Sequence, residues 1–151
     1  MRLIQVADHV LVMTYPMVQD PKLLKLVLKN TYLAMQSTMA SLLHYERYYK
    51  RVSPFTENYI AMLQLVRPVF EKYKISKGYV GFLTELYETN ERQKRSDVEF
   101  VRKDKMVFAS KDYDLCAVSV IELKDIVAKG KLFMNAVNGV IKEDERRNGK
   151  C

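Results

Sequence analysis

Apolar positions along residues 20–51 follow the spacing of one long α-helix. Asp20 can cap the free amides of a first turn, and Pro21 suits the first helical position because an amide hydrogen is not needed there. From Leu24 onward, core-type residues alternate by four and three positions and form one continuous seam. The seam comprises Leu24, Leu28, Thr31, Met35, Thr38, Leu42, Tyr45 and Tyr49. This pattern predicts a helix that packs along its whole length.

Three further leucines, Leu26, Leu33 and Leu43, lie off that seam. A helix with a second apolar face is buried on two sides, either by other helices of the same chain or by a second subunit. We therefore predict that the three leucines complete the core or form a surface for self-association. The second alternative implies a homo-oligomer built on this face.

Proline positions predict where other helices of the first half begin and end. Residues 3–13 predict a short helix that ends before Pro16, because the residue preceding a proline disfavours helical backbone. Ser53 and Pro54 repeat the start signal of the long helix and predict the next one. Pro68 falls inside that helix, where it is expected to cause a kink or a break.

The second half of the chain combines helical segments with a β-prone one. A helical pattern covers residues 79–91, and Ser119 with Glu122 forms an S-x-x-E capping box at the start of a last helix. Gly130 is expected to weaken that helix midway. Residues 105–118 contain a β-prone run followed by a turn signal, which predicts a small hairpin or an extended loop.

The fold class predicted from these elements is all-α: an up-down helical bundle of four or five main helices, with a short irregular or hairpin excursion before the last helix. A chain of 151 residues suits a single domain. We expect that domain at residues 1–142 and a polar, frayed tail at residues 143–151. Without a long apolar run or a signal-peptide pattern, the sequence predicts a cytoplasmic protein that does not bind membranes.

Basic residues gather in the segment RQKRSDVEFVRKDK, residues 92–105, of a chain whose net charge is +7. A positive protein attracts polyanions. Basic side chains beside an aromatic one, here Phe100, can hold a phosphate backbone and stack a base. The candidate nucleic-acid-binding residues are Arg92, Lys94, Arg95, Arg102, Lys103 and Lys105.

The same segment also has a purely structural interpretation, which the pattern favours. Ser96 and Glu99 form another S-x-x-E box and predict the capped start of a short helix that turns Val98 and Val101 inward. The acidic residues of the segment can neutralise half of its positive charge through local pairs. Under this interpretation the basic residues only hydrate the surface.

Few residues are arranged for catalysis. Neither His9 nor His44 follows a Glu by three positions, as the Glu-x-x-His motif of metal-binding bundles requires. Cys116 has no His nearby in the sequence, and the chain contains no glycine-rich phosphate loop. We predict no metal and no other cofactor. His44 with Arg47 on the same helix leaves one catalytic option, in which they act on RNA as general base and phosphate clamp.

The chain resembles the compact helical bundles called HEPN. The likeness lies in the overall length, the long early helix, and the segment SDVEFVRKDKMVF leading into SVIELKDIVAKGKLF. Its S-x-V-E-F-x-R-K-D-K portion also resembles a segment of an uncharacterised archaeal helical family. Active HEPN members share a closely spaced Arg and His that cleave RNA. Here only Arg2 and His9 meet that spacing, without the usual polar residue after Arg, so the resemblance implies an inactive, binding or partner-type member.

Together these observations predict a non-enzymatic helical-bundle protein that acts by binding. Its expected ligands are a second copy of itself and RNA or another polyanion. One alternative is a HEPN-type RNA-cleaving enzyme that uses His44 or His9. The other is a structural partner of a second protein.

Overall fold

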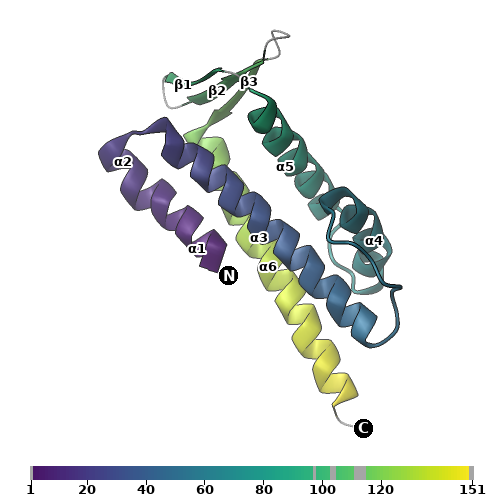
Figure 1. Cartoon of the computed structure of the whole chain (residues 1–151). Helices are drawn as coiled ribbons and strands as arrows, with labels where there is room; N and C mark the ends of the chain where they lie inside the picture. Colours follow the sequence, from purple (N-terminus) through teal and green to yellow (C-terminus); the bar gives the residue numbers. More distant parts are fainter. Residues whose placement is uncertain (1, 97, 103–104, 111–114, 150–151) are drawn as a thin grey trace.

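Helices and one small sheet make up the protein in the computed structural model, which describes residues 2–96, 98–102, 105–110 and 115–149. In chain order the elements are α1 (Arg2–His9), the π-helix η1 (Val10–Thr14), α2 (Tyr15–Val18), α3 (Pro21–Tyr48), α4 (Tyr59–Lys72), α5 (Gly78–Arg95), β1 (Val98–Arg102), β2 (Lys105–Ala109), β3 (Leu115–Ser119) and α6 (Val120–Asn148). The long helices α3 and α6 pack side by side, and the sheet lies at one end of the molecule (Figure 1). The fold is therefore mostly helical, but it is not the all-α fold that the pattern predicted.

The sheet has three antiparallel strands in the order β1-β2-β3. Strands β2 and β3 form a hairpin, which is one of the two alternatives that the β-prone pattern predicted, and Lys105 lies opposite Ser119. Strand β1 replaces the short helix predicted after Ser96. Its sequence VEFVR is rich in β-branched and aromatic residues, which favour pairing with β2 over an isolated helical turn that would be marginal on its own.

Ser96 ends helix α5 instead of starting a new helix. Its hydroxyl donates to the carbonyl oxygen of Gln93 at 2.8 Å and lies 3.1 Å from Oε1 of Glu99. The S-x-x-E spacing therefore brings Ser96 and Glu99 together at a turn from helix into strand. The other capping box was predicted correctly, because Ser119 accepts a hydrogen bond from the amide of Glu122 at 3.0 Å and α6 begins there.

Proline signals were right for α3 and wrong for its neighbours. Oδ1 of Asp20 accepts a hydrogen bond from the amide of Lys22 at 3.0 Å, and α3 begins at Pro21 as predicted. Pro16, however, lies in the first turn of α2. The helical backbone nevertheless runs without a break from α1 through η1 to Val18. The π-helical turn that directly precedes α2 is a local change of hydrogen-bond pattern of the kind that lets a helix continue past a proline.

Helix α4 begins later than predicted. Ser53 and Pro54 lie outside any helix, and the cap is Asn58, whose side-chain oxygen accepts a hydrogen bond from the amide of Ala61 at 3.1 Å. Asparagine is as good an N-cap as serine, so the true start carries its own local signal. Pro68 lies inside α4, which continues to Lys72, so the proline does not break the helix, and a kink there stays a prediction.

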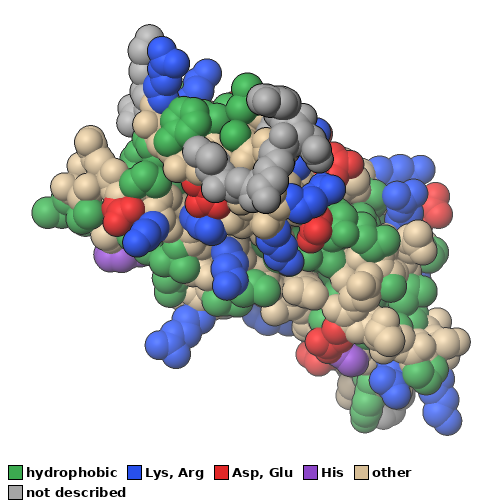
Figure 2. Space-filling model, turned by 45° about the horizontal axis from the view of Figure 1, so that its top comes forward, with side chains coloured by type: hydrophobic (Ala, Val, Ile, Leu, Met, Phe, Trp, Pro, Cys, Tyr) green, Lys and Arg blue, Asp and Glu red, His purple; other side chains and the backbone are tan. Residues whose placement is uncertain are grey.

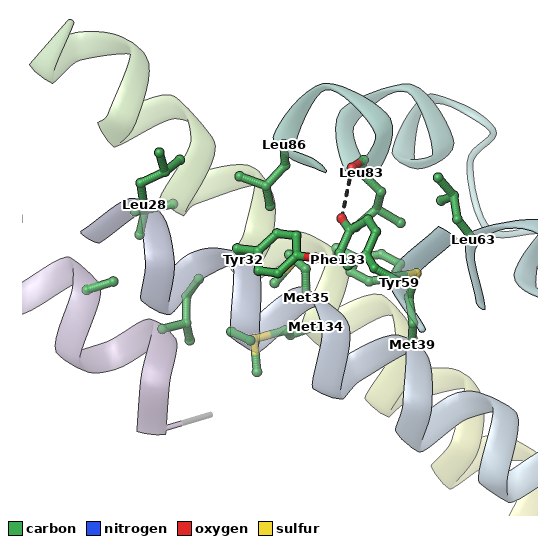
Figure 3. Packing of buried hydrophobic residues seen from close by; sticks show 14 of the residues in the cluster. Leu28, Tyr32, Met35, Met39, Tyr59, Leu63, Leu83, Leu86, Phe133 and Met134 are labelled. Carbon is green, nitrogen blue, oxygen red and sulfur yellow. Dashed lines mark hydrogen bonds between the residues drawn. The ribbon is translucent and has the colours of Figure 1, made fainter. Parts of the chain in front are cut away.

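One hydrophobic core runs between the helices and beneath the sheet. At its centre the ring of Tyr59 stacks between Tyr32 and Tyr87, with centroids 4.7 Å and 5.4 Å away. The Tyr59 hydroxyl donates to the carbonyl oxygen of Leu83 at 2.8 Å (Figure 3). This bond satisfies the polar end of a buried aromatic side chain and ties α4 to α5.

The three leucines outside the α3 seam do not share one surface. Leu43 is fully buried in the chain's own core, and Leu33 is partly buried against that core. Leu26 is 40% exposed. Packing within the chain thus covers most of the predicted second face, and self-association through it stays a prediction.

Helix α6 continues to Asn148, so most of the predicted frayed tail at residues 143–151 is helical. Gly130, predicted as a weak point, lies at a tight contact between helices. A Cβ atom added there would be 3.0 Å from Cδ1 of Ile4 and 3.2 Å from Cε of Met35. The glycine therefore lets α1, α3 and α6 approach closely.

Candidate nucleic-acid interface

The sheet buries one face and exposes the other. Met106 and Phe108 point into the core. Alternate residues lie on the opposite, outer face, because successive side chains of a strand point to opposite sides. On that outer face the register places Phe100 opposite Val107 and Val107 opposite Ala117. Phe100 is 42% exposed, which leaves part of its ring accessible to a ligand.

Arg102 and Lys105 form the next row of the outer face. They are cross-strand partners, both are exposed, and neither has an ion-pair partner in the described part of the chain. Two like charges directly opposite each other in a sheet are unfavourable unless an anion lies nearby. Figure 2, with the sheet end turned forward, shows basic and hydrophobic side chains together on this end of the molecule. We call the surface of Phe100, Arg102 and Lys105 the outer sheet face.

Strand β1 divides the predicted basic patch into two groups. Its five residues span about 13 Å at roughly 3.3 Å per residue. One group lies in the last turn of α5, before β1 begins. The other group lies on the outer sheet face, where β1 ends. The first group is Arg92, Lys94 and Arg95, and the second is Arg102 and Lys105. Lys103 lies outside the described residues.

A crevice of about 360 Å³ opens between α3, α5 and the start of β1. Helix α3 contributes Lys25, Lys29 and Tyr32, which lie on one face because they are spaced by four and three residues. The facing side of α5 contributes Asn90 and Lys94. Burial, with smaller effects of nearby acidic and phenolic groups, raises the pKa of Tyr32 to about 12, so its hydroxyl stays neutral. We call this site the α3–α5 crevice.

Glu99 supplies the negative charge of the α3–α5 crevice. Its Oε1 lies 3.0 Å from Nζ of Lys25, 3.2 Å from Nε2 of Gln93 and 3.1 Å from the hydroxyl of Ser96. Burial raises the pKa of Glu99, but the hydrogen bonds from Lys25, Gln93 and Ser96 outweigh that effect and hold the pKa below its usual value. The carboxylate therefore stays charged and holds Lys25, while Lys29 and Lys94 are not bound to it.

Asn90 carries a buried donor without a partner. The residue is 2% exposed, and its Nδ2 makes no hydrogen bond with the described residues. An unsatisfied buried donor costs about 1–3 kcal/mol, which an oxygen of a ligand would recover. Sequence reasoning missed Asn90, Lys25 and Lys29, because nothing in either helix indicates that the two faces meet.

A second polar cluster lies at the other end of α3, around the buried Glu46. Its Oε1 accepts hydrogen bonds from Nη1 of Arg51 at 3.2 Å and from the hydroxyl of Tyr73, and its Oε2 lies 3.1 Å from Nζ of Lys72. The carboxylate is 1% exposed and would be costly to bury without these donors. Each partner thus compensates the burial of Glu46.

Asp144 extends this cluster to α6. Its Oδ2 accepts hydrogen bonds from the hydroxyl of Tyr45 at 2.6 Å and from Nη1 of Arg51 at 3.1 Å. The hydrogen bond from Tyr45 lowers the pKa of Asp144, and Arg51 lowers it further against the opposing effect of burial. The cluster joins α3, α4 and α6, and its central carboxylates already have partners. We therefore assign it a structural role.

The two histidines lie apart from the α3–α5 crevice. Nε2 of His44 is 2.7 Å from Oε1 of Glu57, and its ring centroid is 4.8 Å from that of Phe55. This contact joins α3 to the segment before α4. His9 is the last residue of α1. Among the described residues, no three His, Cys, Asp or Glu side chains come together as metal ligands.

Comparisons with known proteins found no relatives for this chain. No protein-family model matches it, and no curated protein and no solved structure shows significant similarity to it. In the described part of the chain, no helix is long and apolar enough to cross a membrane. The resemblance to HEPN bundles stays a prediction.

Proposed function

We propose that the protein binds single-stranded RNA on its outer sheet face. The observation that carries this proposal is the position of the exposed Phe100 beside the cross-strand pair Arg102 and Lys105. A ring and two cations on one face provide a stacking surface and two phosphate contacts. These are the two elements that sequence-independent single-strand binding requires.

The geometry of β1 supports this arrangement. Phe100 and Arg102 are two residues apart on one strand, about 6.6 Å, and they point to the same side. A base stacked on Phe100 would leave its phosphate within reach of the long Arg102 side chain, with Lys105 beside it. Such binding needs no base-specific hydrogen bond. The net charge of +7 adds a long-range attraction for the strand.

The test is fluorescence anisotropy of a labelled mixed-sequence RNA at several salt concentrations. The double variant Arg102→Gln/Lys105→Gln should bind more weakly and with a flatter salt dependence. Each phosphate contact to a single strand contributes about 0.7 to the slope of log K against log salt, so the loss of two contacts lowers the slope by about 1.4. Phe100→Ala should cost about 1–3 kcal/mol of binding with little change in slope.

A matched control removes the same charge elsewhere. Lys142 and Arg146 are exposed on α6, and Lys142 is about 33 Å from the start of that helix at 1.5 Å per residue. The variant Lys142→Gln/Arg146→Gln should bind RNA nearly as well as the unchanged protein. Equal weakening by both double variants would show that binding follows net charge, and the outer sheet face would lose its role. No binding at low salt would end the proposal.

A further inference from the structure

The α3–α5 crevice is a different site from the outer sheet face. Glu99, which lines the crevice, points to the opposite side of β1 from Phe100 because the two residues are adjacent on a strand. A ligand in the crevice therefore lies under the strand and between two helices. An inference about this crevice does not depend on RNA binding at the outer face.

The charge of the α3–α5 crevice suits a small dianion. Three lysines and one glutamate line it, so its formal charge is 3 − 1 = +2. Glu99 is held by Lys25. Lys29 has no ion pair in the described part of the chain, and Nζ of Lys94 is 3.6 Å from Glu91 on an exposed surface, where such pairs are weak. A phosphate monoester carries about −1.5 to −2 at neutral pH, which matches this charge.

The donors favour phosphate over carboxylate. The cations of the crevice are lysines, which act as point charges, whereas a planar carboxylate is best held by the two-pronged guanidinium of arginine. Three oxygens of a terminal phosphate can meet three separate donors. Lys29, Lys94 and Asn90 all line the crevice, and Nδ2 of Asn90 has no hydrogen-bond partner among the described residues, so the lining offers three candidate donors.

The size of the crevice also limits its ligand. A volume of about 360 Å³ is at the lower end of small-molecule sites, which hold about 300–1,000 Å³. The ring of Tyr32 is almost fully buried and already stacks on Tyr59, so it forms part of the crevice wall and is not available to stack on a base. Recognition in this site therefore rests on the phosphate.

We propose that the α3–α5 crevice binds a phosphate monoester, with Lys29 and Lys94 neutralising the charge and Nδ2 of Asn90 donating to a phosphate oxygen. Lys25 stays paired with Glu99 at the edge of the site. The same chemistry is present in a free sugar phosphate and in the 5′ phosphate of an RNA. An internal phosphodiester has one charge and fewer free oxygens, so it should be a poorer ligand.

The test follows amide resonances of the ¹⁵N-labelled protein during titration with ribose 5-phosphate and, separately, with ribose. We expect saturable shifts with ribose 5-phosphate, including the side-chain amide of Asn90, with a dissociation constant of about 1 mM or below. Ribose should cause none. Lys29→Gln and Lys94→Gln should each weaken binding about tenfold or more, as expected for loss of a charged hydrogen bond.

Lys22→Gln is the matched control, because Lys22 is exposed on the same helix and does not line the crevice. It should leave the affinity unchanged. Asn90→Asp replaces the donor with an acidic group and should abolish binding. If Asn90→Asp does not fold, Lys29→Gln still tests the proposal, because Lys29 is at an exposed position. Equal shifts with ribose and ribose 5-phosphate, or equal losses in Lys22→Gln and Lys29→Gln, would overturn the proposal.

The source of the phosphate is tested in the Arg102→Gln/Lys105→Gln background, where the outer sheet face is disabled. A 5′-phosphorylated oligonucleotide that binds at least tenfold better than its 5′-hydroxyl counterpart would identify an RNA end as the ligand. Binding of ribose 5-phosphate without that preference would identify a free sugar phosphate. If neither phosphorylated probe binds better than its unphosphorylated counterpart, the crevice is not a phosphate site, whatever the outer face does.

Discussion

Replacing Gly130 by Ala tests whether close helix packing, and not helix weakness, explains this residue. Gly130 and Gly139 both lie inside α6, so alanine at either position should gain about 1 kcal/mol of helix propensity. At Gly139 an added Cβ meets nothing within 4 Å. Gly139→Ala should therefore raise the free energy of unfolding by about that amount.

At Gly130 the added Cβ would lie 3.0 Å from Cδ1 of Ile4 and 3.2 Å from Cε of Met35. Carbon atoms pack best at about 3.5–4.0 Å, so both contacts are too short. Both side chains are buried and confined by their neighbours. Overpacking of this kind costs about 1–3 kcal/mol, which cancels or exceeds the propensity gain.

The assay is urea unfolding of Gly130→Ala, Gly139→Ala and the unchanged protein, followed by circular dichroism. Gly130→Ala should be less stable than Gly139→Ala by about 1–3 kcal/mol. The difference between the two variants isolates packing, since the propensity gain is common to both. If Gly130→Ala is stabilised as much as Gly139→Ala, α1 and α3 adjust freely to the new methyl group and the packing argument is wrong.

Two further predictions concern the polar cluster and the histidines. Hydrogen bonds lower the pKa of Asp144 in the folded state, so its stabilising effect is present above the unfolded pKa of about 3.9 and is lost as pH falls through the folded pKa. Asp144→Asn should lower the free energy of unfolding by about 1.5–3 kcal/mol at pH 7 and flatten the loss of stability below about pH 4. The control is Asp125→Asn, whose carboxylate is in an exposed pair with Lys129; it should change stability by less than about 1 kcal/mol in the same acid and urea titrations. Equal effects of the two variants would refute the structural role assigned to the Asp144 cluster. His9→Ala/His44→Ala should leave RNA binding and the length of the RNA on a gel unchanged; cleavage by the unchanged protein that this variant lacks would instead support the RNA-cleaving alternative.

Local signals in the sequence were enough to predict several helices. The cap at Asp20, the regular seam of α3 and the capping box at Ser119 each depend on residues within a few positions of one another. A helix forms its hydrogen bonds within its own segment, so such signals describe most of what it needs. The β2–β3 hairpin was one of two predicted alternatives for the same reason, because its two strands are close in sequence.

Strand β1 shows where local signals were insufficient. Ser96 and Glu99 have the spacing of a capping box, and they do contact each other. The same spacing can start a helix or follow the end of one. Here the segment VEFVR pairs with β2 as a strand, so the spacing follows the end of α5. A strand finds its hydrogen bonds in another segment, so its formation is decided by the pairing and not by its own residues.

The same distinction between local signals and contacts with distant segments applies to the candidate sites. The sequence by itself identified Phe100, Arg102 and Lys105 as part of a basic, aromatic segment, but the pairing of β1 with β2 placed them on one face. Asn90 and Lys29 belong to different helices, and only the packing of α3 against α5 makes them neighbours in one crevice. Sequence spacing determines which face of a helix a residue occupies, whereas the approach of two helices depends on side chains along their whole contact. For this reason the helices could be predicted, and the crevice emerged only from the tertiary structure.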